Sequence, residues 1–145
     1  EGVRAASDCD LIMIHDAARA CVDMEVIERS IASARIHGSG VAAVPLKDTV
    51  KVADQNGMVL STPDRSTLRI IQTPQTFKAL KLRQLYEALS PKEKELLTDA
   101  AKIFVMKGEK VHIVDGEVFN IKITYPYDLR VAEALIKGEE NKSEG

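Results

Sequence analysis

Five short clusters of polar residues lie at the ends of the predicted elements, where they could carry chemistry. They are Asp16 with Arg19, Lys47-Asp48-Thr49, Asp64-Arg65, Thr73-Pro74-Gln75 and Asn120-Ile121-Lys122. Lysine and arginine bind phosphate oxygens and stabilise the negative charge that builds up in a transition state. An acid and a guanidinium three residues apart, with two alanines between them, suit a phosphorylated polyol or a nucleotide.

Each cluster also has an ordinary structural explanation. Asp16 and Arg19 could equally form a salt bridge within a loop, and Lys122 could be an edge-strand lysine that opposes aggregation. The other candidates have similar alternatives: a surface pair with Asp64 for Arg65, turn formation for Thr49 and Thr73, helix capping for Thr98 and a place in the core for His15.

The first polar cluster follows a run of four apolar residues, 11–14, which is typical of a strand buried on both faces. Asp23 and Gly38 are suited to begin and end a helix, and residues 41–44 form a second apolar run. Strand, helix and strand in this order predict a parallel unit with a right-handed crossover. Ligands bind at the carboxyl ends of such strands, where Asp16 and Arg19 lie.

The rest of the chain predicts a hairpin and further alternating elements. Asn56-Gly57 lies between the alternating segments 49–52 and 58–60, which predicts a hairpin arm spanning about residues 47–67. We expect strands at 68–72, 111–114 and 120–124, with the first ended by Thr73-Pro74. We expect helices over 77–89, from the capping box at Ser90, from Thr98-Asp99 to Gly108, and from Pro126, with a disordered tail over 139–145.

Composition narrows the possible functions. The chain has 145 residues, a net charge of −2 and 45% hydrophobic residues, enough for one domain with a core. Neither the charge nor its distribution favours nucleic-acid or membrane binding. The two cysteines and three histidines have no metal-ligand spacing, and no leader or membrane-spanning segment is apparent. We expect a soluble α/β protein of a reducing compartment.

The ordered motifs resemble those of the 2-C-methyl-D-erythritol 4-phosphate cytidylyltransferases of the non-mevalonate isoprenoid pathway. The motifs are IHDAAR, VPLKDTVK, TPDRSTL, IQTPQTF, LLTDAAKIF and FNIKITYPYDLRVAEALI. The related ribitol-5-phosphate cytidylyltransferases share the overall plan, and TDAAKIF is more similar to theirs. The KDTVK and DRSTL segments favour the methylerythritol branch.

The resemblance implies a Rossmann-like, mostly parallel α/β sheet of the nucleotidyltransferase type with a protruding hairpin arm. It implies a reaction in which a polyol phosphate attacks the α-phosphate of CTP and releases pyrophosphate, with a divalent metal, Mg²⁺, on the phosphates. Lys122 would be catalytic and contact the nucleotide, and Ala17 would lie against its ribose. The substrate-binding residues would be Asp16, Arg19, Thr49, Arg65, Thr73 and Thr98, and no residue is assigned as a metal ligand.

The resemblance also implies a homodimer, because Thr49 and Arg65 would reach the partner's substrate from the arm. We expect a cytoplasmic protein, or a plastid stromal one in a plant. Ala20 stands where the family usually has proline, and the family's glycine-rich CTP loop is missing. Residues 1–138 would therefore be the carboxyl-terminal portion of the domain, inactive alone. The alternatives are a ribitol-5-phosphate cytidylyltransferase and a non-catalytic binding or dimerisation module.

Overall fold

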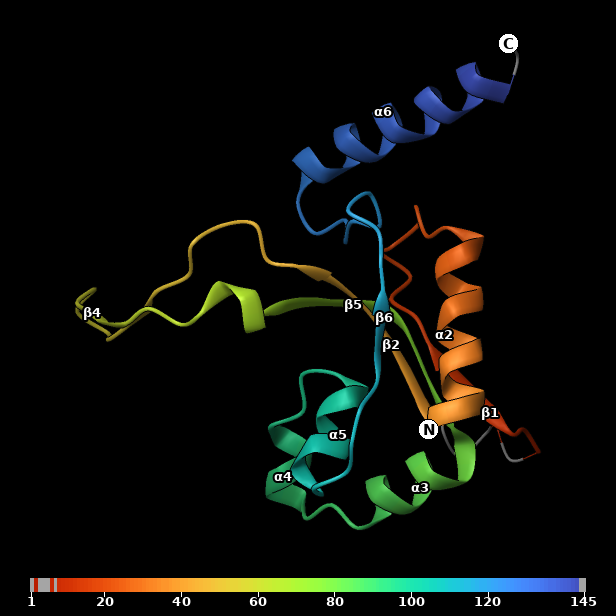
Figure 1. Cartoon of the computed structure of the whole chain (residues 1–145), viewed down its shortest axis with the longest axis vertical. Coiled ribbons are helices and arrows are strands. Elements are labelled where there is room, and N and C mark those ends of the chain that lie inside the picture. The colour runs from red at the N-terminus through yellow and green to blue at the C-terminus, as the bar shows by residue number, and fades with distance from the viewer. Residues whose placement is uncertain (1, 3–5, 7, 144–145) are drawn as a thin grey trace.

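A four-stranded mixed sheet in the order β1–β5–β2–β6 organises the fold in the computed structural model, which describes residues 2, 6 and 8–143 (Figure 1). The strands are β1 (Leu11–Ile14), β2 (Ser39–Pro45), β5 (Arg69–Lys78) and β6 (Ile113–Asp115). β5 is antiparallel to both β1 and β2, whereas β2 and β6 are parallel. The sheet thus places the carboxyl end of β1 beside the middle of β5, with Ile14 opposite Gln75.

The α/β class is as expected, but the prediction of a mostly parallel sheet is wrong for this part of the chain. β1 and β2 point in the same direction, yet β5 lies between them and runs against both. β5 also continues through Thr73-Pro74, where we expected it to end. The register with β2 is irregular there, passing from Gln75 opposite Val41 to Ile71 opposite Ala43. A proline is tolerated at such an irregularity because no ladder hydrogen bond is lost.

The predicted hairpin is confirmed as a separate two-stranded arm that projects from the body (Figure 1). It consists of β3 (Val52–Ala53) and β4 (Val59–Ser61), followed by the short helix η1 (Arg65–Thr67). The Asp54 carboxylate accepts the backbone N–H groups of Asn56 and Met58, each at 2.9 Å. Gly57 has a φ of +81°, a value that glycine adopts without strain.

Helices α2 and α4 begin where their capping residues predict. α2 (Met24–His37) is capped by Asp23 and ends at Gly38, whose φ is +88°. α4 (Pro91–Glu95) carries the predicted capping box at Ser90. The other helices are α3 (Ala79–Glu87), α5 (Ala100–Met106) and α6 (Pro126–Ser143). The helix predicted from residue 77 begins at Ala79, because β5 extends to Lys78. Residues 139–143 of the predicted tail continue α6, and residues 144–145 lie outside the described residues.

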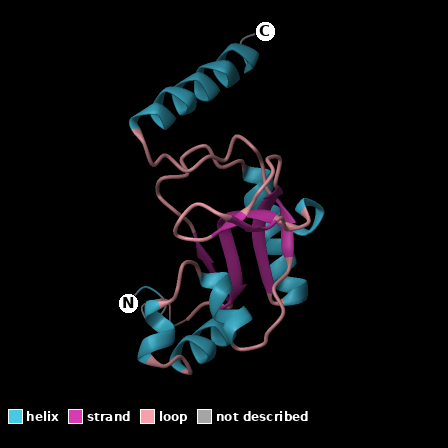
Figure 2. Ribbon diagram, turned by 90° about the vertical axis from the view of Figure 1, so that its left-hand side faces the viewer, coloured by secondary structure: helices cyan, strands magenta, loops and turns pink. Residues whose placement is uncertain are grey.

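The hydrophobic core lies where the sheet meets α3 and α5. Phe77 of β5 stacks on Phe104 of α5 with ring centroids 4.6 Å apart, and both side chains are buried. Leu82 of α3 completes this cluster. α2 packs along β2 and β5, while α3, α4 and α5 gather at the end of the sheet away from α6 (Figures 1 and 2). The opposite end of the sheet remains available for polar groups.

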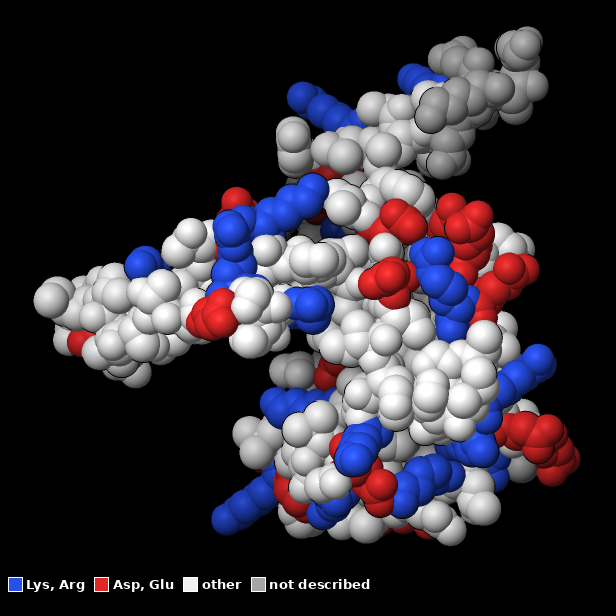
Figure 3. Space-filling model, viewed as in Figure 1, with Lys and Arg blue, Asp and Glu red and all other residues white. Residues whose placement is uncertain are grey.

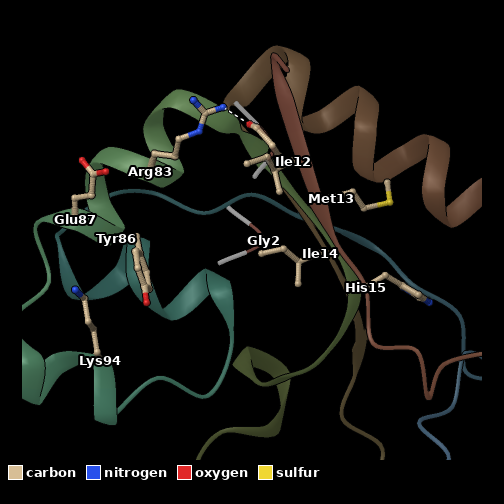
Figure 4. A pocket seen from close by; sticks show the side chains of 10 residues that line it. Gly2, Ile12, Met13, Ile14, His15, Arg83, Tyr86, Glu87 and Lys94 are labelled. Atoms are coloured by element: carbon tan, nitrogen blue, oxygen red, sulfur yellow. Dashed lines mark hydrogen bonds between the residues drawn. The ribbon is translucent and has the colours of Figure 1, made fainter. Parts of the chain in front are cut away.

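β1 is an edge strand of the described sheet. A groove of about 700 Å³ follows it, with Ile12 and Ile14 on one wall and Tyr86 and Lys94 on the other (Figure 4). Arg83 of α3 donates a hydrogen bond from Nη2 to the carbonyl oxygen of Ala6 at 2.6 Å. Among the described residues, β1 pairs with β5 alone.

Candidate active site

The loop after β1 is fixed to β5 by a threonine hydroxyl. The backbone N–H of Asp16 donates to Thr73 Oγ1 at 3.0 Å, and the backbone N–H of Arg19 donates to the carbonyl oxygen of Asp16 at 2.9 Å. These bonds close a tight turn over residues 16–19. The pairing of β1 with β5 therefore brings the first and fourth sequence clusters together.

His15 adds a second connection within this loop. Its Nδ1 lies 3.0 Å from Thr73 Oγ1, and its Nε2 lies 3.0 Å from the carbonyl oxygen of Arg19. Because Thr73 Oγ1 already accepts the Asp16 N–H, its own proton is free to be donated to Nδ1, which leaves Nε2–H to donate to Arg19. The residue is exposed, so the prediction that it lies in the core is wrong.

Lys122 lies in an irregular segment, so the strand predicted over 120–124 is wrong. No ladder forms because the segment crosses the end of the sheet, where the Ile123 N–H donates to the carbonyl oxygen of Ala18 at 2.8 Å. Lys122 Nζ lies 3.1 Å from Asp16 Oδ2, and Arg19 Nε lies 3.8 Å from the same oxygen. One carboxylate thus faces two cations, which leaves the cluster with a net positive charge.

Asn120 fixes the start of the Lys122 segment. Its side chain is fully buried and donates from Nδ2 to the carbonyl oxygen of Thr73 at 2.8 Å and to Gln72 Oε1 at 3.3 Å. The backbone carbonyl oxygen of Asn120 accepts a hydrogen bond from Arg19 Nη1 at 2.7 Å. Arg19 and the Lys122 segment are therefore held by the same residue.

The Arg19 guanidinium is largely enclosed, with its side chain 11% exposed. Burial lowers the pKa of Arg19, and the nearby charge of Asp16 opposes this effect. Its Nε is buried and has no hydrogen-bond partner among the described residues. Arg19 also lines a cavity, where a guanidinium is a favourable partner for a phosphate oxygen of a ligand.

A buried glutamine builds the other wall. Gln75 donates from Nε2 to Asp99 Oδ2 at 3.0 Å, and its Oε1 accepts the backbone N–H of Ala101 at 3.1 Å. It thereby holds the beginning of α5, with the exposed Thr98 beside it, against β5. The resulting cavity of about 540 Å³ is lined by Ile14, Asp16, Arg19, Ile71, Gln72, Thr73, Gln75, Thr98, Asp99, Ala100 and Lys122.

A second cavity of about 390 Å³ shares Arg19, Gln72 and Lys122 with the first. Its far wall carries Lys47 and Asp48, at the base of the arm, together with apolar side chains such as Val118. Two neighbouring ligands, or two parts of one ligand, could thus meet at Arg19 and Lys122.

The structure brings five of the predicted site residues around one cavity: Asp16, Arg19, Thr73, Thr98 and Lys122. Thr49 and Arg65 do not line it, because both lie on the arm segment away from the cavity. Arg65 donates from Nη1 to the carbonyl oxygen of Lys47 at 2.7 Å rather than pairing with Asp64. Ala17 is exposed in the loop after β1 and is not among the lining residues.

The sequence did not reveal the roles of Gln72, Gln75 and Asp99, or the anchoring role of Asn120. Their side chains bond to segments far along the chain, for example over the 47 residues between Asn120 and Thr73. The available signal was the cluster of polar residues inside an otherwise apolar strand, at residues 72–76. Polar side chains at buried strand positions require partners, which indicates a packed polar network.

Neither a metal cluster nor a membrane span emerges from the described part of the chain. Residues 2, 6 and 8–143 contain no group of three or more histidine, cysteine, aspartate or glutamate side chains arranged to hold a metal ion. None of the helices described there is long and apolar enough to cross a membrane.

Residues 1–138 match the family model of 2-C-methyl-D-erythritol 4-phosphate cytidylyltransferase. The enzyme of that name from Alkaliphilus oremlandii is 43% identical over 137 residues, which are 94% of this chain and 58% of the relative. The one from Caldanaerobacter subterraneus is 44% identical over 131 residues, 90% of this chain and 57% of the relative. The chain thus spans under three fifths of the length of these curated relatives.

Solved structures show the same similarity. The 2-C-methyl-D-erythritol 4-phosphate cytidylyltransferase from Thermus thermophilus superposes with a TM-score of 0.80 at 32% identity, covering 93% of this chain and 65% of that one. The 4-diphosphocytidyl-2C-methyl-D-erythritol synthase from Anaerococcus prevotii superposes with a TM-score of 0.81 at 33% identity, covering 94% and 63%. The expected nucleotidyltransferase fold, present in part, is confirmed.

Proposed function

Because this chain belongs to the 2-C-methyl-D-erythritol 4-phosphate cytidylyltransferase family, we propose that it supplies the polyol-phosphate side of a cytidylyltransferase active site. In this reaction an oxygen of the sugar phosphate attacks the α-phosphorus of CTP. A new P–O bond forms, the bond to the β-phosphate breaks, and pyrophosphate leaves. The meeting of Lys122, Arg19 and Asp16 in one cavity is the observation that carries the proposal.

Each residue of this cluster has a role that its contacts support. Lys122 Nζ stabilises the negative charge that builds up on the α-phosphate, because a fixed ammonium acts most strongly where charge develops. Arg19 lines the cavity and binds the phosphate of the polyol through its guanidinium group. Asp16 accepts hydrogen bonds from the polyol hydroxyls. Thr73 and Thr98 line the same cavity. Ala17, exposed in the loop after β1, offers a small surface to the nucleotide ribose.

We also propose a homodimer that forms through the arm. The arm carries exposed apolar side chains at Met58 (66%), Val59 (59%) and Leu60 (65%), and its tip bears few charges (Figure 3). Apolar side chains gathered on a projecting arm are typical of a surface that becomes covered by another subunit. Thr49 and Arg65 would then reach the partner's substrate. Partial activity in mixtures of Arg65→Ala and Lys122→Ala subunits, each inactive alone, would support shared sites.

The residues of the cavity do not form a metal site by themselves. Asp16 already faces two cations, and the Asp99 oxygens accept hydrogen bonds from Gln75 and the backbone of Lys102. A magnesium ion in the proposed reaction would take its ligands mainly from the CTP phosphates.

Release of pyrophosphate from CTP tests the function. The assay compares 2-C-methyl-D-erythritol 4-phosphate with ribitol 5-phosphate, using this chain alone and this chain extended by the sequence encoded upstream in its reading frame. We expect turnover with the methylerythritol substrate and the extended protein, because the named relatives are longer and carry that activity in their names. Preference for ribitol 5-phosphate, or no turnover by the extended protein, would refute the proposal.

A further inference from the structure

The segment from β6 to α6 carries Lys122 but has little regular structure of its own. Between residues 117 and 124, Asn120 is the one buried residue, and the others are exposed or half-buried. A segment that is so exposed keeps its position only through its few anchors. The position of Lys122 therefore depends strongly on how Asn120 is held.

The contacts of Asn120 fix which way its amide points. Both groups near its Nδ2, the carbonyl oxygen of Thr73 and Oε1 of Gln72, accept hydrogen bonds, so the NH₂ group must face β5. Gln72 in turn donates from Nε2 to the carbonyl oxygen of Glu117 at 2.8 Å. Two amide side chains thus tie the segment to β5 at two points.

The close passage of the chain at Gly116 agrees with this arrangement. A Cβ atom at this position would overlap Gln72 Oε1, and it would also lie 3.3 Å from backbone atoms of Ala43. The Gly116 N–H donates to the carbonyl oxygen of Ala43 at 2.9 Å. At the end of β6 the segment therefore packs closely against Gln72, the glutamine that accepts a hydrogen bond from Asn120.

We propose that Asn120 is a positioning residue that sets Arg19 and Lys122 relative to each other for the proposed transfer. The side chain of Asn120 anchors the segment to β5, and its backbone carbonyl oxygen accepts a hydrogen bond from Arg19 Nη1. Lys122 follows two residues later in the same segment. The effect of Asn120 on catalysis rests on the proposed function. The anchoring of the segment by Asn120 does not, because it is a property of the folded chain. Asn120 touches neither reacting atom in this role.

Asn120→Asp provides the sharpest test because it keeps the shape and replaces the NH₂ donor with an oxygen. That oxygen would face two hydrogen-bond acceptors, which is unfavourable. Hydrogen–deuterium exchange of this chain should speed up about tenfold in peptides covering residues 15–20 and 116–125, and remain unchanged in α2. Gln84→Glu makes the same amide-to-acid change at an exposed position of α3 and serves as the control.

Gln72→Met decides the question if Asn120→Asp does not fold. It removes one of the two anchors and keeps the bond from Asn120 to Thr73, so exchange over residues 116–125 should again exceed that of the control. Exchange equal to that of Gln84→Glu in every folded variant would overturn the proposal.

Kinetics of the extended protein supply the second readout. Asn120→Asp should lower kcat about 100-fold, because a displacement of about 1 Å can cost this much. The KM for the polyol phosphate should rise by a smaller factor, because Arg19 loses its fixed position as well. A general loss of folding would instead lower the amount of active protein and the thermal midpoint together. If the unmodified extended protein shows no turnover, the proposed function fails while the exchange data still decide the anchoring role. A kcat equal to that of Gln84→Glu would overturn the positioning role.

Discussion

Removing the Lys122 ammonium should lower turnover strongly while changing the free energy of unfolding little. Its partner in the structure is Asp16, at 3.1 Å, and the two side chains are 52% and 37% exposed. Ion pairs with this exposure contribute about 0–1 kcal/mol to folding. Lys122→Ala should therefore change the free energy of unfolding by less than about 1 kcal/mol.

The expected effect on turnover is much larger. A donor placed at developing charge is worth about 2.7–4 kcal/mol in the transition state, which corresponds to a loss of about 10²–10³-fold in kcat. Lys122→Arg should recover only part of this loss, because a planar guanidinium cannot replace an ammonium at a fixed position. Lys110→Ala, an exposed lysine outside both cavities, is the matched control.

The assay follows pyrophosphate release by the extended protein together with unfolding in urea. We expect kcat to fall while the KM for the polyol phosphate changes little, because the ammonium acts mainly on the transition state. An increase in KM with unchanged kcat would show that Lys122 only binds the ground state. A change in stability of several kcal/mol would show that the ion pair with Asp16 is its main role.

Three further predictions concern the framework of the site. The side chain of Lys107, together with the Ser90 N–H, lowers the pKa of Glu93 to about 2. The ionised carboxylate therefore stabilises the fold fully above its ordinary pKa of 4.5, and this contribution is lost as the pH falls towards 2. Glu93→Gln should therefore flatten the decline of the thermal midpoint between pH 5 and pH 2, and an unchanged pH profile would contradict this. Phe104→Ala should cost about 3–5 kcal/mol in urea unfolding, because it empties the stacked core position, and a loss below about 1 kcal/mol would refute that role. Gly116→Ala should lower kcat in the extended protein at nearly constant KM, since the added Cβ displaces the Lys122 segment; a fully active variant would count against the close approach.

The sequence predicted those elements whose signals are local. Asp23 and Gly38 delimit α2, Asn56-Gly57 marks the arm, and Ser90 begins α4, because in each case the capping or turn residue acts on its immediate neighbours. The apolar run at 11–14 likewise forms β1, which positions Asp16 and Arg19. The prediction that this strand is buried on both faces is wrong for the described residues, because all four of its residues are half-buried at the edge of the sheet.

The errors arose where distant residues decide the outcome. β5 passes through Pro74 because an irregular register with β2 tolerates it, and no pattern near Pro74 shows that irregularity. Residues 120–124 alternate like a strand, yet Asn120 bonds to β5 by its side chain and the backbone finds its partner in the loop after β1. Predicting these features would require knowledge of the sheet order, which local spacing does not contain.

The Asp16 carboxylate, which lies between Lys122 and Arg19, influences which anions the site binds. Asp16 acts as a resident counter-ion, so an incoming anion must compete with it for Lys122 and Arg19. Inorganic phosphate offers its oxygens to the cations but brings no chain of hydroxyls to compensate the displaced carboxylate. A polyol phosphate brings both groups in one molecule. In the proposed reaction the cluster would therefore bind a polyol phosphate in preference to inorganic phosphate.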